Sequence, residues 1–183
     1  HEFDVSFLLT NRNRWDISSL SIRPVRIKTL GSYLPKGRLS EFIINIVGDR
    51  YVNLEKYLSE ADIVHAEELS FWFTAETARV KGHSRCRYKL VQTIWETIPL
   101  LETYRHRHGR FFRRTILRET DFFLTTTERA RECLLMEGGE PNRIEVCYPG
   151  ICTERFSEAV YSSPPPRKHV ILSPGRFVWE KGH

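Results

Sequence analysis

The feature that most constrains the fold is a regular alternation of short apolar runs and amphipathic segments. Apolar runs typical of strands occur at residues 62–66, 88–96, 120–126 and 143–150, and segments with helical periodicity separate them, at 69–82, 100–119 and 127–139. Strands that alternate with helices at this spacing form βαβ units, in which the strands are parallel. The pattern therefore predicts an α/β fold, a Rossmann-like parallel sheet with helices on both faces.

The two ends of the chain predict a piece of a longer protein. The sequence begins with His1 and runs at once into an alternating strand over residues 3–9. A half-exposed strand is expected near 25–29, and residues 38–61 are mainly helical in character, with a break near Gly48. We therefore expect a first domain at 1–160 that lacks the first strand of its sheet. A Pro-rich connector at 161–168 and the first strand and loop of a second domain at 169–183 follow.

Composition excludes several classes of protein. With 40% hydrophobic residues the chain is an ordinary globular sequence, and no apolar run approaches the roughly 20 residues that a membrane span needs. Its four cysteines form no C-x-x-C pair, which favours reduced thiols in a cytoplasmic protein and gives no metal-ligand spacing. The net charge of +5 is concentrated in the arginine-rich segment 101–118.

Several segments together resemble the retaining GT-B glycosyltransferases of family 4. They are "ADIVHAEE", "YKLVQTIWETIP", the long run from "TDFFLTTTERARE" to "YPGICTERF", and "GRFVWEKG". The resemblance implies two Rossmann-like domains and the transfer of a sugar from a nucleotide-sugar to a glycan, lipid or small-molecule acceptor, with retention of configuration. The nucleotide-sugar is a substrate, and no cofactor or metal is implied. An acidic pair that binds the sugar is expected beyond residue 183, so the fragment alone is predicted to be inactive.

The resemblance assigns the donor diphosphate to the last loop of the sequence. Arg176 and Lys181 are implied to hold the diphosphate, with Gly175 and Gly182 beside them. A guanidinium group can bind two phosphate oxygens at once, and a lysine adds a point charge, so the assignment is chemically sound. A Pro-Gly turn with nearby charges is also common on solvated surfaces. If the assignment holds, Arg176→Ala weakens nucleotide-sugar binding in the intact enzyme.

Three strand ends supply candidate residues for the acceptor side of the cleft, because ligands of α/β sheets bind beyond the carboxyl ends of strands. At the first strand end, His65 and Glu67 are two residues apart and point to the same side of the strand. They could orient an acceptor hydroxyl, or they could form a plain surface hydrogen bond.

At the third strand end, Thr127 with its neighbours Thr125 and Thr126 caps a helix and could also face an acceptor phosphate. Thr125 and Glu128 have capping-box spacing.

The second strand end carries Trp95 and Glu96, and the resemblance places Trp95 where many members of the family carry a histidine that touches the donor sugar. Trp95 could stack on a sugar face while Glu96 accepts hydrogen bonds from hydroxyl groups. A tryptophan at the edge of the core would explain the same residue equally well.

The arginine-rich segment, Arg105 to Arg118, admits three interpretations. It is a solvated helix whose apolar stripe packs on the sheet, a contact with the anionic inner face of a membrane, or a collector of a phosphorylated acceptor. A nucleic-acid-binding module is a further alternative, disfavoured because no recognition motif is present. A nucleotide-sugar epimerase of GT-B architecture is the alternative reaction on the same fold.

Overall fold

The computed structural model describes residues 3–12, 16–18, 21–22, 24–83, 86–101 and 107–156. The chain divides into two compact units, residues 1–149 and 150–183. The second contributes to the described residues only through 150–156, which include a 3₁₀ turn, η3 (Thr153–Phe156). The predicted connector at 161–168 and the predicted second-domain segment at 169–183 lie outside the described residues, so the predicted domain boundaries stay a prediction.

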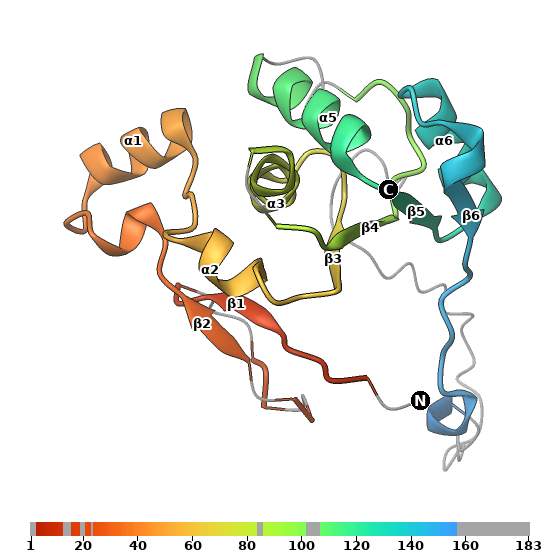
Figure 1. The fold of residues 1–183 in the computed structure, drawn as a ribbon, viewed down its shortest axis with the longest axis horizontal. Coiled ribbons are helices and arrows are strands. Elements are labelled where there is room, and N and C mark those ends of the chain that lie inside the picture. Colours follow the sequence, from red (N-terminus) through yellow and green to blue (C-terminus); the bar gives the residue numbers. More distant parts are fainter. Residues whose placement is uncertain are drawn as a thin grey trace, which may run out of the picture. The chain divides into compact units, whose positions relative to one another are not determined.

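The first unit is built on a sheet of four parallel strands (Figure 1). The strands are β3 (Ile63–Glu67), β4 (Lys89–Ile94), β5 (Phe122–Thr125) and β6 (Ile144–Val146), and they lie in this order across the sheet. Each falls within or overlaps one of the apolar runs identified in the sequence. The predicted α/β class and the parallel sheet are confirmed.

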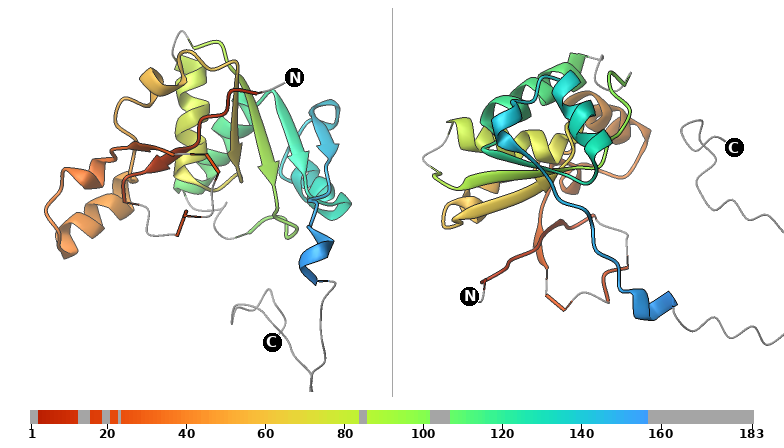
Figure 2. Two further views of the ribbon diagram at one scale, coloured as in Figure 1. Left: turned by 90° about the horizontal axis from the view of Figure 1, so that it is seen from below. Right: turned by 90° about the vertical axis from the view of Figure 1, so that its right-hand side faces the viewer.

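Three helices connect the strands: α3 (Trp72–His83), α5 (Arg107–Glu119) and α6 (Glu128–Met136). They lie on the same face of the sheet (Figures 1 and 2), whereas the sequence analysis expected helices on both faces. The strand order explains the difference. Each strand pairs with the next one in the chain, and right-handed crossovers that all step in one direction place every helix on the same side.

Burial alternates along the strands accordingly. Leu90, Gln92 and Ile94 of β4 are buried beneath the helices, together with Phe123 of β5. The core is completed by apolar side chains of the helices, among them Ala78, Ile116 and Leu134. On the other face the side chains are half-buried or exposed, and Ile63 is 59% exposed. The apolar residues of this sheet are thus concentrated under α3, α5 and α6.

The N-terminal part of the first unit contains a second, smaller sheet, and its buried residues Ile27, Leu54 and Leu58 belong to the same core as the four-stranded sheet. Strands β1 (Leu8–Thr10) and β2 (Val25–Ile27) pair with each other in parallel, as a sheet of their own. The 3₁₀ turn η1 (Leu30–Ser32) and the helices α1 (Arg38–Val47) and α2 (Leu54–Leu58) follow. The predicted helix break is confirmed, because α1 ends at Gly48, whose φ of +84° favours glycine.

A residue that follows α6 in the sequence binds the C-terminal end of α5. Arg143, in the 3₁₀ turn η2 (Pro141–Arg143), donates hydrogen bonds to the carbonyl oxygens of Leu117 (3.1 Å) and Thr120 (2.7 Å). A helix leaves its last carbonyl groups without intrahelical partners, and a cation there also interacts favourably with the negative end of the helix dipole. None of the described helices is long and apolar enough to cross a membrane.

Candidate functional site

The carboxyl ends of the four parallel strands lie along one edge of the sheet, which we call the carboxyl edge. The residues that follow the strands there are Glu68 after β3, Trp95 and Glu96 after β4, and Thr126 and Thr127 after β5. In open α/β sheets this edge is where ligands bind, because the strands end and the helices diverge. The sequence analysis selected this edge for the same reason.

The segment that follows β4, residues 95–101, is held by several hydrogen bonds, and we call it the β4–α5 loop. At its start, the backbone N–H of Trp95 donates a 2.8 Å hydrogen bond to Oε1 of Glu68. Glu68 itself is tied to β4, because its backbone N–H donates to the carbonyl oxygen of Thr93 (3.0 Å). The end of β3 therefore holds the beginning of the loop.

Two further carboxylates hold the rest of the loop. Oε1 of Glu96 accepts hydrogen bonds from the backbone N–H groups of Thr97 and Ile98, both at 2.9 Å. Glu137, at the end of α6, accepts the backbone N–H of Leu100, whose φ is +58°. Charge-assisted hydrogen bonds of this kind are stronger than neutral ones, so the loop has a fixed shape before any ligand arrives.

Glu137 also ties the loop to α5. Its side chain is fully buried and pairs with the guanidinium group of Arg113, which is largely buried as well. Breaking such a pair leaves one charge buried without a partner, so the contact is expected to matter for stability. The β4–α5 loop is thus held by carboxylates from β3, from the loop itself and from α6.

The Trp95 side chain remains accessible although its backbone is fixed. Its residue is 49% exposed, while Ile94, immediately before it, is buried at 1%. Trp95 thus lies at the edge of the core with about half of its surface accessible, which agrees with both interpretations of the sequence, and its role in binding a sugar stays a prediction. An exposed aromatic ring on an ordered backbone offers a flat apolar surface beside hydrogen-bonding groups.

Two ionisable groups near the carboxyl edge, Glu68 and Cys133, have raised pKa values. Burial, together with the negative charges of Glu96 and Glu67, raises the pKa of Glu68 to about 7, although hydrogen bonds from the backbone of Trp95 and Glu96 act in the opposite direction. Burial also raises the pKa of the Cys133 thiol to about 12, with the carboxylates of Glu137, Glu96 and Glu68 contributing. Cys133 is therefore a neutral, unreactive thiol at neutral pH.

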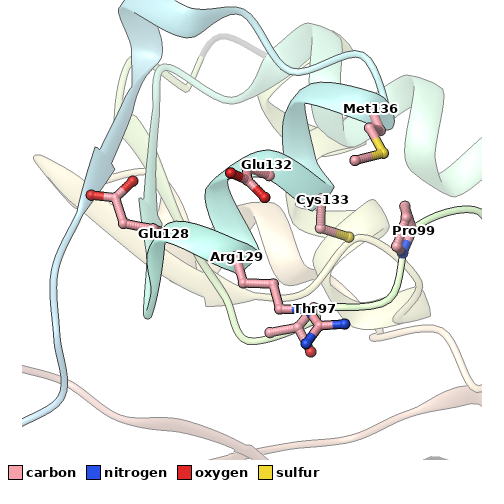
Figure 3. Close-up of a pocket in the computed structure, with 7 residues that line it drawn as sticks. All are labelled: Thr97, Pro99, Glu128, Arg129, Glu132, Cys133 and Met136. Carbon is pink, nitrogen blue, oxygen red and sulfur yellow. The ribbon is translucent and has the colours of Figure 1, made fainter.

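A pocket of about 570 Å³ opens between the β4–α5 loop and α6. Figure 3 shows the loop residues on one side and the helix residues on the other. Its wall combines apolar groups with both signs of charge, and the lining residues are Thr97, Pro99, Glu128, Arg129, Glu132, Cys133 and Met136. The β4–α5 loop therefore forms one wall of a pocket near the end of β4.

The other predicted cleft residues lie at the same edge or near it, in different roles. Nε2 of His65 lies 2.7 Å from Oγ1 of Thr93 on the neighbouring strand. His65 and Glu67 share the exposed side of β3, as the alternation predicted. The contact that the structure gives the imidazole is thus the surface hydrogen bond, and the acceptor-orienting role of the pair stays a prediction.

Of the three threonines at the end of β5, Thr127 caps a helix. Thr127 is the N-cap of α6, and its hydroxyl oxygen accepts the backbone N–H of Ala130 at 3.1 Å. The Thr125–Glu128 capping box expected from spacing is replaced by this cap, because Thr125 is still in β5, where its hydroxyl donates to the carbonyl oxygen of Glu145 (3.3 Å). A role of Thr127 in binding an acceptor phosphate stays a prediction.

Sequence reasoning missed Glu68 and Glu137. A signal for Glu68 existed, since two acids in succession end β3, but the alternation rule directed attention to Glu67. Glu137 had no sequence signal, because it lies 37 residues from its partner Leu100. The predicted donor residues Gly175, Arg176, Lys181 and Gly182, and Arg105 of the arginine segment, lie outside the described residues.

Among the described residues, no group of three or more His, Cys, Asp or Glu side chains could hold a metal ion. Comparison of the chain with protein-family models, with curated proteins and with solved structures yields no match. The glycosyltransferase resemblance consequently rests on the sequence motifs alone.

Proposed function

We propose that this chain is the acceptor-side part of a retaining glycosyltransferase, and that the acceptor sugar binds at the carboxyl edge beside β4. The observation that carries the proposal is the combination at Trp95: an exposed ring on a backbone that Glu68 holds in place. The α/β sheet supports the proposal as a suitable scaffold, although the same fold serves many other reactions.

The chemistry of the edge suits carbohydrate. A sugar ring has an apolar face of C–H groups, which packs on an aromatic ring, and a rim of hydroxyl groups, which donate hydrogen bonds to carboxylates. Trp95 supplies the ring, and Glu96 follows it directly as an acceptor. Because the loop is ordered beforehand, little conformational entropy is lost when the sugar binds.

In the proposed reaction the donor is a nucleotide-sugar held by Arg176 and Lys181. The bond from the anomeric carbon to the phosphate oxygen breaks, a bond from the same carbon to an acceptor hydroxyl oxygen forms, and the hydroxyl proton passes to the departing phosphate. Cations near the diphosphate lower the barrier, since negative charge accumulates on the departing phosphate. The acceptor edge contributes orientation, which holds the acceptor hydroxyl close to the reacting carbon.

A glycan array followed by calorimetry on the bound glycans tests the proposal. We expect Trp95→Ala to weaken glycan binding about tenfold or more, the equivalent of one lost ring contact. Phe111→Ala is the matched control, because Phe111 is similarly exposed (55%) but lies on α5. Binding that survives Trp95→Ala unchanged, or an absence of binding to every glycan, would contradict the proposal.

A specific observation also favours contact with an anionic surface. Arg110, Arg114 and Arg118 recur every four residues along α5 and are exposed, with the exposed ring of Phe111 beside them. We call these four residues the α5 arginine stripe. The apolar side of the same helix faces the core through Ile116, with Phe112 and Leu117 packed against it.

This division of α5 agrees with the solvated-helix interpretation and is also what a surface-bound helix requires. Arginine side chains near an anionic membrane each contribute roughly 1 kcal/mol, and a single aromatic ring can enter the interface. We therefore propose the α5 arginine stripe as a peripheral contact for anionic lipid. Nucleic acid remains the disfavoured alternative.

A further inference from the structure

Glu68 has a backbone conformation that its residue type rarely adopts. Its φ is +64°, in the left-handed region, which costs a residue with a Cβ on the order of 1 kcal/mol. It directly follows β3, which continues regularly up to Glu67. Surrounding contacts must hold Glu68 in this conformation, and strain of this kind is concentrated at functional sites.

The left-handed turn directs Glu68 across to the neighbouring strand. The backbone N–H of Glu68 donates to the carbonyl oxygen of Thr93 in β4, and its side chain accepts the N–H of Trp95, two residues farther along. The residue that follows β3 therefore makes hydrogen bonds on both sides of the point where β4 ends.

We propose that Glu68 is a positioning residue, whose carboxylate holds the backbone of Trp95 so that the exposed ring keeps a fixed place at the carboxyl edge. The positioning is independent of what the ring binds. Only the statement that the ring receives a sugar rests on the proposed function.

The surroundings of Glu68 make the positioning sensitive to pH. The ionisable groups that act on it are Glu67 on β3, Glu96 in the β4–α5 loop and Cys133 on α6. Cys133 stays neutral, since its pKa is about 12. The negative charges that act on Glu68 are therefore those of Glu67 and Glu96. With a pKa of about 7, Glu68 is ionised at pH 8 and protonated at pH 6. Ionisation strengthens the hydrogen bond from Trp95, because a charged acceptor binds an N–H group more tightly than a neutral one.

Nuclear magnetic resonance of the ¹⁵N-labelled 183-residue chain tests the proposal without any ligand. We expect the backbone amide of Trp95 to titrate with a midpoint near the pKa of Glu68, about 7. Glu68→Gln should abolish this titration while leaving the spectrum of the sheet unchanged, since its amide oxygen still accepts the N–H. A Trp95 amide that does not titrate near this pH, or titrates equally in Glu68→Gln, would overturn the proposal.

Two further variants sharpen the test. Glu96→Gln removes a like charge next to Glu68, so it should lower the midpoint of the Trp95 titration. Glu68→Ala removes the acceptor, and amide exchange at Trp95 should become about tenfold faster, as for the loss of one charge-assisted hydrogen bond. Unchanged exchange in Glu68→Ala would show that the carboxylate does not hold the loop, and would overturn the proposal even if the variant is less stable.

Sugar binding separates the inference from the proposed function. With chitobiose, maltose and lactose as probes, we expect affinity to rise about fivefold from pH 6 to pH 8 in the unmodified chain, and to stay constant in Glu68→Gln. If none of the sugars binds but the Trp95 amide titrates as described, the proposed function fails and the positioning role stands. If a sugar binds with the same pH dependence in both proteins, the positioning role fails.

Discussion

Two regions of the first unit present an exposed aromatic ring among charged side chains, and they are built in opposite ways. At the carboxyl edge, the charges near Trp95 are carboxylates, and the described contacts direct Glu68, Glu96 and Glu137 onto backbone N–H groups. On the α5 arginine stripe, the charges near Phe111 are guanidinium groups on an exposed helix surface.

The difference indicates which kind of partner each region suits. A carboxylate that accepts a backbone N–H fixes the chain that carries Trp95, and a fixed ring can select a ligand by shape and direction. Exposed arginines provide a positive field without a fixed geometry, which attracts any anionic surface and weakens with salt. Equal exposure of an aromatic ring therefore does not imply equal function.

The largest expected effect is on the free energy of unfolding, and it distinguishes the buried charges of the carboxyl edge from the exposed charges of α5. Glu137→Ala removes the partner of the largely buried Arg113 and the acceptor for the N–H of Leu100. We expect the free energy of unfolding, measured by urea denaturation, to fall by about 3 kcal/mol.

The control for this variant is an exposed ion pair on α5, the helix that carries Arg113. Arg118 pairs with Glu119, but its side chain is 65% exposed. Arg118→Ala should change the free energy of unfolding by less than about 1 kcal/mol. Equal losses of unfolding free energy in Glu137→Ala and Arg118→Ala would contradict the distinction between buried charges at the carboxyl edge and exposed charges on the α5 arginine stripe.

The next effect concerns lipid binding by the stripe. Replacing both Arg110 and Arg114 by alanine should weaken binding to mixed phosphatidylglycerol and phosphatidylcholine vesicles by about 2 kcal/mol, and added salt should weaken binding of the unmodified chain. Vesicle cosedimentation measures the change. Trp95→Ala serves as the control and should bind as the unmodified chain does. Binding that is indifferent to salt and to the two arginines would exclude the stripe as the contact.

The smallest effect is the pH dependence of stability that Glu68 confers. Its folded pKa, about 7, lies above the ordinary value of 4.5, so between these values the folded chain binds more protons than the unfolded chain. The stabilisation is complete below the ordinary value and is lost as pH rises through about 7. Glu68→Gln should remove a decline on the order of 1 kcal/mol between pH 5 and pH 8, seen by urea denaturation at both values. An identical decline in the variant would refute the assignment.

The fold was largely predictable because its signal is periodic. Apolar runs such as the one in β4, and glycine at the end of α1, depend on residues near in sequence, and each predicted strand and helix of the four-stranded sheet is present. The side of the sheet that the helices cover depends on strand order, which periodicity does not contain. That is why helices were expected on both faces.

The candidate site was predictable only in part. Trp95 and Glu96 were found because they follow an apolar strand, and the carboxyl edge is determined by topology. The residues that hold them were not found, since Glu68 acts through a left-handed backbone and Glu137 through a contact formed only in the folded chain. Patterns among neighbouring residues predict where β4 ends. Hydrogen bonds from residues far away in the sequence determine the conformation of the loop that follows it.

The proposed carbohydrate site is tested most directly by mapping a bound glycan on the ¹⁵N-labelled chain by chemical-shift perturbation. We expect the largest shifts at Trp95, Glu96 and Thr97, with small shifts along α5, and we expect Trp95→Ala to abolish them. Perturbations centred on Arg110 and Arg114, or spread over the open face of the sheet around Ile63, would contradict the claim that the carboxyl edge beside β4 is the carbohydrate site.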